Sequence, residues 1–330
     1  MNTQAKIVWG VSPLEKGARP PSKALESISK VFAGLHPEIQ PVTVVPAGLL
    51  KHGDKEDVWK EIAATIYRNL EQKIKGHKVS NLLPARLLRV EGSASSDTVA
   101  CLIQFALEEG ADVIAVDSHN RKGLEKIFMG SFAETLVLQS PLPVLVFNPR
   151  TQTPTKLKRI LYPTDFSEAS HEVFMRIAKL AAKLNVPIYL FHKLYFARPE
   201  LVGMPFVFPA IAKESIKEVK QAFLDKGKEW ADHAKGFGVR VKVHLDTQPG
   251  PALDEILKTI KRMGGSTLVA MASQSGPVKS VLLGSLTRQI LRHSTCPVVV
   301  LHAEQESRIK EFLVGAENFA YSYSAHPLIR

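Results

Sequence analysis

Short apolar runs alternate with longer amphipathic segments along the whole chain. The apolar runs have the length of buried strands, and none is long enough to cross a membrane. The amphipathic segments repeat their apolar positions at helical spacing. Strands are therefore predicted at residues 6–11, 41–46, 85–91, 112–117, 143–148, 159–163, 187–191, 239–245, 266–271 and 298–301. Helices are predicted at residues 22–34, 54–75, 96–109, 131–139, 168–184 (after an N-cap at Ser167), 215–236, 252–263 and 285–293.

Strands that alternate with helices predict βαβ units and a mostly parallel sheet. Four of the runs are apolar at every position, at residues 113–116, 144–147, 268–271 and 298–301. Such runs are typical of strands that helices cover on both faces. The predicted fold class is therefore α/β, with two doubly wound, mostly parallel five-stranded sheets of Rossmann-like architecture.

Two sheets are predicted because the sequence contains an internal repeat, with one copy in each half. GADVIAVDSH at 110–119 matches GGSTLVAMAS at 264–273, and IFMGSFAETLVLQSPLPVLVFNP at 127–149 matches VLLGSLTRQILRHSTCPVVVLHA at 281–303. Gly130 and Gly284 lie 154 positions apart (284 − 130). A period this long indicates duplicated domains and not a solenoid. We predict a first domain at 1–150, a polar linker rich in proline, a second domain at 157–303 and a C-terminal extension at 304–330.

The extension at 304–330 has no counterpart in the first half. Its pattern predicts a helix at 306–313, followed by a tail that carries Phe319, Tyr321 and Tyr323. Because aromatic side chains are costly to leave in water, we expect the tail to pack on one of the domains or on a partner.

Composition narrows the class of protein. The chain has 330 residues, of which 45% are hydrophobic and 23% charged, as in an ordinary globular protein. Its two cysteines, Cys101 and Cys296, form no CxxC pair, so we expect buried, reduced thiols and no disulfide or zinc scaffold. The N-terminal residues lack a signal-peptide pattern, which favours a cytoplasmic protein. The net charge is +11, but the Lys and Arg residues are scattered, so a nucleic-acid partner is not expected.

Candidate chemistry lies at the helix that precedes the last strand of each half. In parallel sheets, ligands bind beyond the carboxyl ends of the strands. Gly284-Ser285 opens this helix in the second half, and Gly130-Ser131 opens it in the first. A helix N-terminus presents backbone N–H groups and a partial positive charge, which suit a phosphate group. The alternative is that each serine simply caps its helix after a glycine turn.

Two segments of the second half give the chain a family resemblance. ILYPTDFSEAS at 160–170 and SVLLGSLTRQILRHSTCPVVVLH at 280–302 resemble the first and last segments of the universal stress protein family, here in a tandem arrangement. The resemblance covers residues 4–148 and 157–302. It implies a stress-response ligand-binding protein. Because the last strands of two domains commonly pair in this family, it also implies an internal pseudo-dimer of the two halves, with further pairing into a homodimer open.

The resemblance also implies a nucleotide site in the second half. Nucleotide-binding members of the family carry an aspartate after the first strand and a glycine motif that ends in Gly-Ser. Here the first two glycines of that motif are replaced by Ala272 and Ser275. The ligand would be ATP or AMP, with Mg²⁺ if it is a triphosphate. The implied site residues are Pro163, Thr164, Asp165, Ala272, Ser275, Gly284, Ser285, Leu286 and Thr287.

The first half departs further from the motif. Ser12 stands where the aspartate is expected, and Asp117 and Asn120 replace the two glycines, while Gly130 and Ser131 remain. A carboxylate at Asp117 would repel a triphosphate unless a cation were present. We therefore predict a weaker site here, or none.

Other functions stay open at this point. One alternative is a universal stress protein that binds no nucleotide and acts through dimerisation and protein partners. An enzyme such as a slow nucleotidase is less favoured, because no general base, P-loop or metal-ligand motif is visible. His119 and His192 are interpreted as structural residues. Lys279 and Arg292 flank the closing motif and are interpreted as solvated positions.

Overall fold

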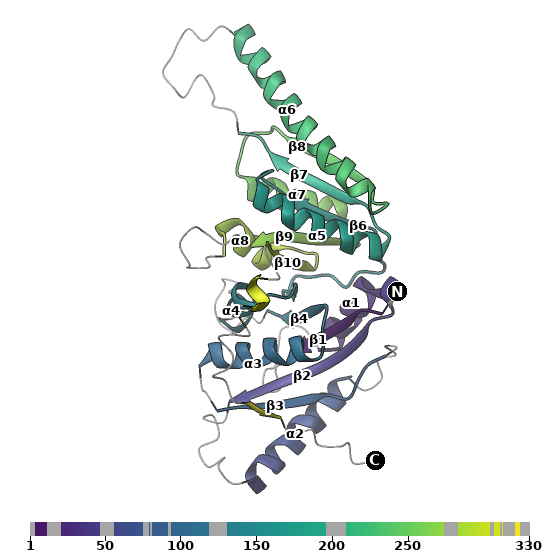
Figure 1. Ribbon diagram of the computed structural model, residues 1–330, viewed down its shortest axis with the longest axis vertical. Coiled ribbons are helices and arrows are strands. Elements are labelled where there is room, and N and C mark those ends of the chain that lie inside the picture. Colours follow the sequence, from purple (N-terminus) through teal and green to yellow (C-terminus); the bar gives the residue numbers. More distant parts are fainter. Residues whose placement is uncertain are drawn as a thin grey trace.

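A single sheet runs through both halves of the molecule. The computed structural model describes residues 4–11, 21–46, 56–74, 79, 81–91, 94–118, 131–195, 209–273, 283–303, 307–310, 312 and 321–323. Figure 1 shows the two halves stacked along the long axis, with helices on both faces of the strands. The eleven strands follow the order β11-β3-β2-β1-β4-β5-β10-β9-β6-β7-β8. The predicted α/β class is confirmed, but the two five-stranded sheets are joined into one.

The first half has the predicted order of elements. These are β1 (Lys6–Gly10), α1 (Pro21–Val31), a 3₁₀ turn (Ala33–Leu35), β2 (Glu38–Pro46), α2 (Glu56–Ile74), β3 (Arg86–Val90), α3 (Ser95–Glu108), β4 (Val113–Asp117), α4 (Ser131–Gln139) and β5 (Val144–Phe147). The strand predicted from residue 41 begins three residues earlier, at Glu38. The prediction treated Pro41 as the start of the strand, whereas Pro41 lies within the ladder and pairs with Trp9.

The second half repeats the plan. Its elements are β6 (Arg159–Pro163), α5 (Glu168–Leu184), β7 (Ile188–Lys193), α6 (Pro209–Lys235), β8 (Val241–Asp246), α7 (Ala252–Met263), β9 (Thr267–Ser273), α8 (Ser285–His293) and β10 (Val298–His302). The bounds of α7 and α8 are those predicted. Helix α6 begins six residues before the predicted start, because Pro209 suits the first helical position, where no amide donor is needed.

Two hydrophobic layers sandwich the sheet. One layer contains Trp9, Phe174 and Trp230 and lies under α1, α2, α5 and α6. The other contains Leu102 and Ile290 and lies under α3, α4, α7 and α8. Each strand of the sheet's interior therefore buries both faces, which explains the unbroken apolar runs.

Both cysteines are free and buried, as expected. Burial raises the pKa of the Cys101 thiol to about 12 and that of the Cys296 thiol to about 11. Both side chains therefore stay protonated and inert at neutral pH.

The two halves join through their last strands. β5 and β10 run antiparallel, and Leu145 pairs with Val299. Over the last helix and strand of each half, residues 154 positions apart correspond, so Leu145 and Val299 are equivalent residues (145 + 154 = 299). Equivalent residues meet each other only on a two-fold axis. The internal pairing implied by the family resemblance is thus present, with a pseudo-two-fold axis through this pair.

Matching hydrogen bonds cross the axis on both sides. The Asn148 amide donates to the Leu291 and Ser294 carbonyls at 2.9 and 2.8 Å. Its equivalent, His302, places Nε2 2.7 Å from the Val137 carbonyl, which is the equivalent of Leu291. Glu134 and Arg288 are also equivalent positions, but their charges are opposite. Glu134 Oε1 and Arg288 Nε form an ion pair at 2.8 Å.

Part of the C-terminal extension returns to the first half. β11 (Tyr321–Tyr323) pairs antiparallel with β3 at the edge of the sheet, which confirms that the tail packs on a domain. Residues 307–310 of the predicted helix at 306–313 are helical. Arg308 donates to the Leu138 carbonyl at the end of α4, at 2.7 Å. None of the described helices is long and apolar enough to span a membrane.

A substitution at Asn148 tests how strongly its hydrogen bonds hold the β5–β10 joint between the two halves. Asn148→Ala leaves the buried Leu291 and Ser294 carbonyls without their donor, which costs about 1–3 kcal/mol per group. We expect the free energy of unfolding in urea to fall by at least about 2 kcal/mol. Gln139→Ala, at the exposed end of α4, is the control and should change it by less than about 0.5 kcal/mol. Equal effects of the two substitutions would show that the Asn148 bonds do not hold the joint.

Candidate functional site

The candidate site lies at the carboxyl edge of the sheet in the second half. β6 lies beside β9, and the connection after β6 runs to β7 on one side, whereas the connection after β9 runs to β10 on the other side. Open α/β sheets bind ligands at such a switch point. Pro163 ends β6, Thr164 and Asp165 follow it, and Ala272 and Ser273 end the neighbouring β9. The structure thus brings the predicted Pro163–Asp165 segment beside the end of β9.

The segment after β6 is held in one conformation. The backbone N–H of Thr164 donates to the Phe191 carbonyl at 2.9 Å, and its hydroxyl accepts from the Phe166 N–H at 3.0 Å. Asp165 Oδ1 accepts from the Ser170 hydroxyl at 2.6 Å and from the Ser167 N–H at 3.0 Å. Phe166 has a φ of 60°, an unfavourable conformation for a side chain of this size. These contacts fix the direction of the exposed Asp165 side chain.

Ser167 caps α5 as predicted. Its hydroxyl accepts from the Ser170 N–H at 3.3 Å. The Asp165–Ser170 bond lies in the same first turn, so the aspartate is coupled to the start of this helix.

The start of α8 is open. Gly284 is the N-cap residue, and no side chain among the described residues caps the helix. Ser285 is the first helical residue and is exposed, so the alternative of simple serine capping is wrong for this helix. The first amides of a helix have no acceptor within it and can bind an anion. The buried Thr287 donates its hydroxyl to the Ala272 carbonyl at 3.4 Å, which ties the first turn of α8 to the end of β9.

Ser273 was not predicted as a site residue, although it follows Ala272 directly. Its side chain is buried, with 2% of the residue exposed, and its hydroxyl has no hydrogen-bond partner in the described part of the chain. Alternation along β9 turns Ser273 to the same face as Met271, the face that α7 and α8 cover. A ligand at this edge could satisfy the hydroxyl.

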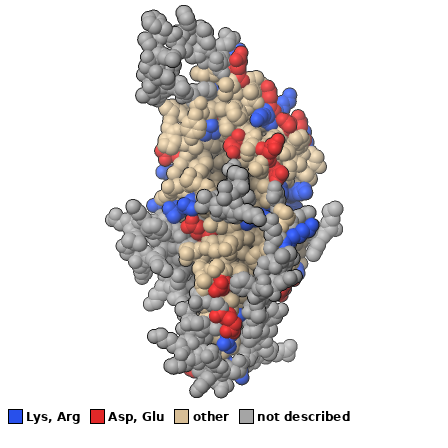
Figure 2. Space-filling view, turned by 60° about the vertical axis from the view of Figure 1, so that its left-hand side comes forward, with Lys and Arg blue, Asp and Glu red and all other residues tan. Residues whose placement is uncertain are grey.

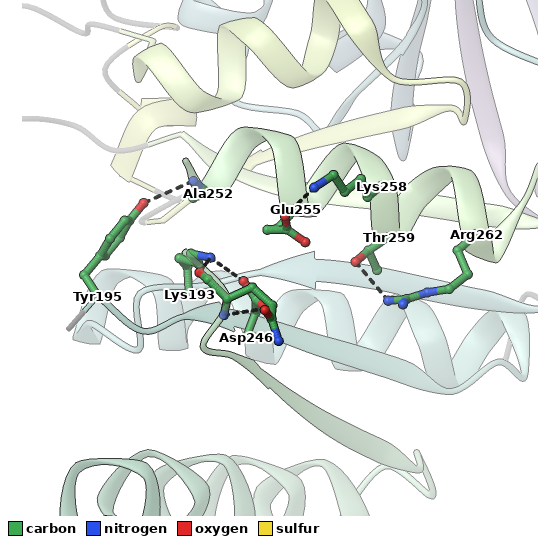
Figure 3. Close-up of polar contacts among 9 residues, drawn as sticks. Lys193, Tyr195, Asp246, Ala252, Glu255, Lys258, Thr259 and Arg262 are labelled. Carbon is green, nitrogen blue, oxygen red and sulfur yellow. Dashed lines mark hydrogen bonds and ion pairs between the residues drawn. The ribbon is translucent and has the colours of Figure 1, made fainter. Parts of the chain in front are cut away.

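A buried ion pair joins the ends of β7 and β8, on the side of β6 that faces away from β9, and sequence reasoning missed it (Figure 3). Lys193 Nζ lies 2.5 Å from Asp246 Oδ2 and also donates to the Gln248 carbonyl. Burial alone would raise the pKa of the Asp246 carboxyl. Hydrogen bonds from Lys193 and the Gln248 N–H, with the lysine charge, instead hold that pKa below its ordinary value. The available signal was a lysine at the end of one strand and an aspartate at the end of the next.

A tyrosine side chain accepts a hydrogen bond at the N-terminus of α7, the helix that follows β8. The Ala252 N–H donates to the Tyr195 hydroxyl at 3.2 Å, so a side chain takes the place that an anion could occupy (Figure 3). Farther along α7, Lys258 pairs with Glu255 at 2.7 Å. The polar groups near Lys193 thus satisfy one another, whereas the start of α8 offers donors to a ligand.

His192 is structural, in line with its interpretation from sequence. Its ring is half-buried and stacks on Phe223 with centroids 4.2 Å apart. Its Nδ1 lies 2.7 Å from the Thr164 carbonyl. Burial lowers the pKa of His192, so the ring is neutral at neutral pH. This contact helps to hold the backbone of the Thr164 segment in place.

The first half offers fewer site residues. Asp117 ends β4 opposite Phe147, as Ala272 stands opposite Leu301 in the second half. Because Phe147 and Leu301 correspond in the repeat, Asp117 takes the place of Ala272 and puts a carboxylate at the strand end. Ser131 begins α4 and is exposed. The remaining predicted residues Ser12, Asn120 and Gly130, and Ser275 of the second half, lie outside the described residues, as do His119 and Lys279.

The side chains described around the site also bear on the question of a metal centre. Among the described residues, no group of three or more His, Cys, Asp and Glu side chains could hold a metal ion. On the face shown in Figure 2, basic and acidic side chains lie interspersed over the described surface.

The buried pair provides a test of what holds this edge together. Lys193→Met leaves Asp246 as an uncompensated buried charge, and we expect the free energy of unfolding to fall by about 3–5 kcal/mol. The double variant Lys193→Met/Asp246→Leu removes both charges and should recover most of that loss. Urea unfolding of the three proteins measures both effects. A double variant no more stable than the single one would contradict this account.

The same pair predicts an acid dependence. Because the pKa of Asp246 is lowered in the folded protein, the pair contributes its full stability above the ordinary carboxyl pKa of about 4. That contribution is lost as the pH falls through the lowered value. The wild type should therefore lose stability relative to the double variant, which lacks both charges, as the pH falls below about 4.

Comparison with known proteins agrees with the repeat and the fold. A model of the universal stress protein family matches residues 21–148 and 156–302. Universal stress protein MJ0531 of Methanocaldococcus jannaschii is 26% identical over 145 residues, which are 44% of this chain and 81% of that protein. Universal stress protein Rv2319c of Mycobacterium tuberculosis is 26% identical over 204 residues, which are 61% of this chain and 68% of that protein.

Solved structures share the whole architecture. A universal stress protein from Archaeoglobus fulgidus superposes with a TM-score of 0.58 at 20% identity, covering 90% of this chain and 98% of that one. The functionally unknown protein PA1789 of Pseudomonas aeruginosa superposes with a TM-score of 0.59 at 13% identity, covering 95% and 97%. These likenesses establish the fold, and the two family matches cover most of the sequence. The chain therefore belongs to the universal stress protein family and carries two domains of that family in tandem.

Proposed function

We propose that the second half binds one adenine nucleotide, ATP or AMP, and that the protein acts as a ligand-binding module in the stress response. The phosphates would lie on the first turn of α8, at Gly284, Ser285, Leu286 and Thr287. The adenosine would lie over the end of β6, at Pro163, Thr164 and Asp165. The family motif supports this assignment at Asp165 and at Gly284-Ser285.

The proposal rests mainly on the backbone angles of Gly284 and on the space around it. Its φ of −53° and ψ of 143° are open to any residue, so the backbone does not require glycine. A Cβ added here would meet only the Thr287 hydroxyl among the described atoms, at 3.9 Å. Among the described residues, nothing hinders a side chain at Gly284, so the glycine here supports the close approach of a ligand to the helix amides.

Polar groups around the turn suit a phosphate. The α8 amides and helix dipole favour negative charge. The Ser285 hydroxyl is exposed beside them, and the Ser273 hydroxyl lacks a hydrogen bond within the described chain. With a triphosphate, Mg²⁺ would bind as the counter-ion of the phosphates.

The loss of the first motif glycine does not argue against the proposal. Ala272 pairs in register with Leu301 inside a regular strand, where alanine has the backbone angles that the strand needs. Its side chain is small, so the ribose or phosphate can still approach the strand end.

Gly284→Asp and Gly284→Ala test the phosphate assignment. The aspartate favours the helix start electrostatically but repels a phosphate, so binding of ATP and AMP should be lost while the fold persists. The alanine should weaken binding about tenfold, or 1.4 kcal/mol. Isothermal titration measures affinity, and thermal unfolding checks that neither variant is destabilised. Asp165 is a poorer probe, because its carboxylate also binds Ser167 and Ser170.

Ser131→Asp is the matched control, since it places the same charge at the start of the equivalent helix α4. It should leave nucleotide affinity unchanged if the second half holds the site. Mass spectrometry of small molecules released from the denatured wild type identifies the ligand. No nucleotide in that release, together with no binding at millimolar ATP or AMP, would reject the proposal and favour association with protein partners.

A further inference from the structure

Helices α5 and α6 bring two histidines into contact on the outer face of the second half. His171 lies in the first turn of α5, and His233 lies in the last turn of α6. His171 Nε2 and His233 Nδ1 are 3.0 Å apart. His233 is exposed and His171 is half-buried, so solvent reaches the pair. The pair belongs to no part of the nucleotide site proposed above, and the inference does not rest on that site.

Two aromatic rings of the core hold the imidazole of His171 in place. The His171 ring lies 5.0 Å from the Trp230 ring, centroid to centroid, and 6.2 Å from that of Phe174. Trp230 is buried and stacks on Phe174 at 5.0 Å. Because these rings are packed in the core, His171 has little freedom to move away from His233. The two nitrogens are therefore presented together without a loop having to fold.

The spacing of the nitrogens suits a shared metal ion. Two imidazole nitrogens bound to one ion at about 2.0–2.1 Å lie roughly 2.9–3.4 Å apart for bond angles between square-planar and tetrahedral. The observed 3.0 Å falls within that range. Rotation of the rings is enough to turn both lone pairs toward one ion. Imidazole is a preferred ligand of Cu²⁺, Ni²⁺ and Zn²⁺, and not of Mg²⁺ or Ca²⁺.

The charges around the pair favour a cation. Glu172 follows His171 in the chain, and Glu229 lies one helical turn before His233, and both act electrostatically on His171. Lys235, two residues after His233 on α6, is paired with Asp232 at 2.5 Å. No third ligand is already in place among the described residues, so water would fill the remaining positions.

We propose that His171 and His233 form a two-histidine site for a transition-metal ion, best suited to the tetragonal geometry of Cu²⁺ or Ni²⁺. The bound ion links the first turn of α5 to the last turn of α6.

Cu²⁺ titration of the full-length protein without a polyhistidine tag tests the site. Trp230 lies against His171, so a bound Cu²⁺ should quench its fluorescence with a stoichiometry of one ion per chain. His171→Ala and His233→Ala should each weaken binding at least about tenfold. His244→Ala removes another exposed histidine of the same half and should leave the affinity unchanged.

Electron paramagnetic resonance of the copper complex counts the nitrogen ligands directly. The wild type should show two imidazole nitrogens and each histidine variant at most one. Trp230→Phe should lose the quenching and keep the two-nitrogen signal. Ni²⁺ should raise the thermal midpoint of the wild type but not of the His171→Ala/His233→Ala double variant. Equal copper affinity in wild type and both single variants, or a one-nitrogen signal in the wild type, would overturn the proposal.

Discussion

The antiparallel pairing of β5 with β10 is the contact on which the rest of the molecule depends. An edge strand exposes a row of unpaired amides and carbonyls, and here each half covers the edge of the other. The pairing turns two sheets into one of eleven strands. Asn148 and His302 then extend the contact from the strands to the ends of α8 and α4. Because these helices precede the joined strands, their orientation at the sheet edge follows from the same pairing.

Duplication preserved the backbone of this joint while its side chains diverged. Glu134 and Arg288 occupy equivalent positions and form an ion pair across the pseudo-axis. If two second halves met in this way, Arg288 would face Arg288, and two first halves would bring Glu134 against Glu134. Like charges at this distance repel, so the pair favours the union of one first half with one second half. Covalent linkage in a single chain makes that union the one available at the lowest entropic cost.

The sequence predicted most of the fold because its signals were local. The bounds of α7 and α8 follow from the helical periodicity of their apolar positions, and the unbroken apolar strands follow from burial on both faces. The contacts between distant residues were not predictable in this way. Lys193 meets Asp246 only because β7 and β8 pair in a given register, and His171 meets His233 only because α5 packs on α6. The pairing of β11 with β3 was missed for a related reason, since it joins residues that lie far apart in the sequence.

The same reasoning explains why the candidate site was only partly visible. Gly284 and Asp165 stand in recognisable motifs, whereas Ser273 became a candidate only when its buried hydroxyl proved to lack a partner among described residues. The pairing registers place Asp117 where the second half has Ala272, so a carboxylate replaces a methyl group at one strand end. A phosphate there would meet that charge in the first half and the open start of α8 in the second. Through the shared joint, the first half completes the sheet of the second whether or not it binds a ligand itself.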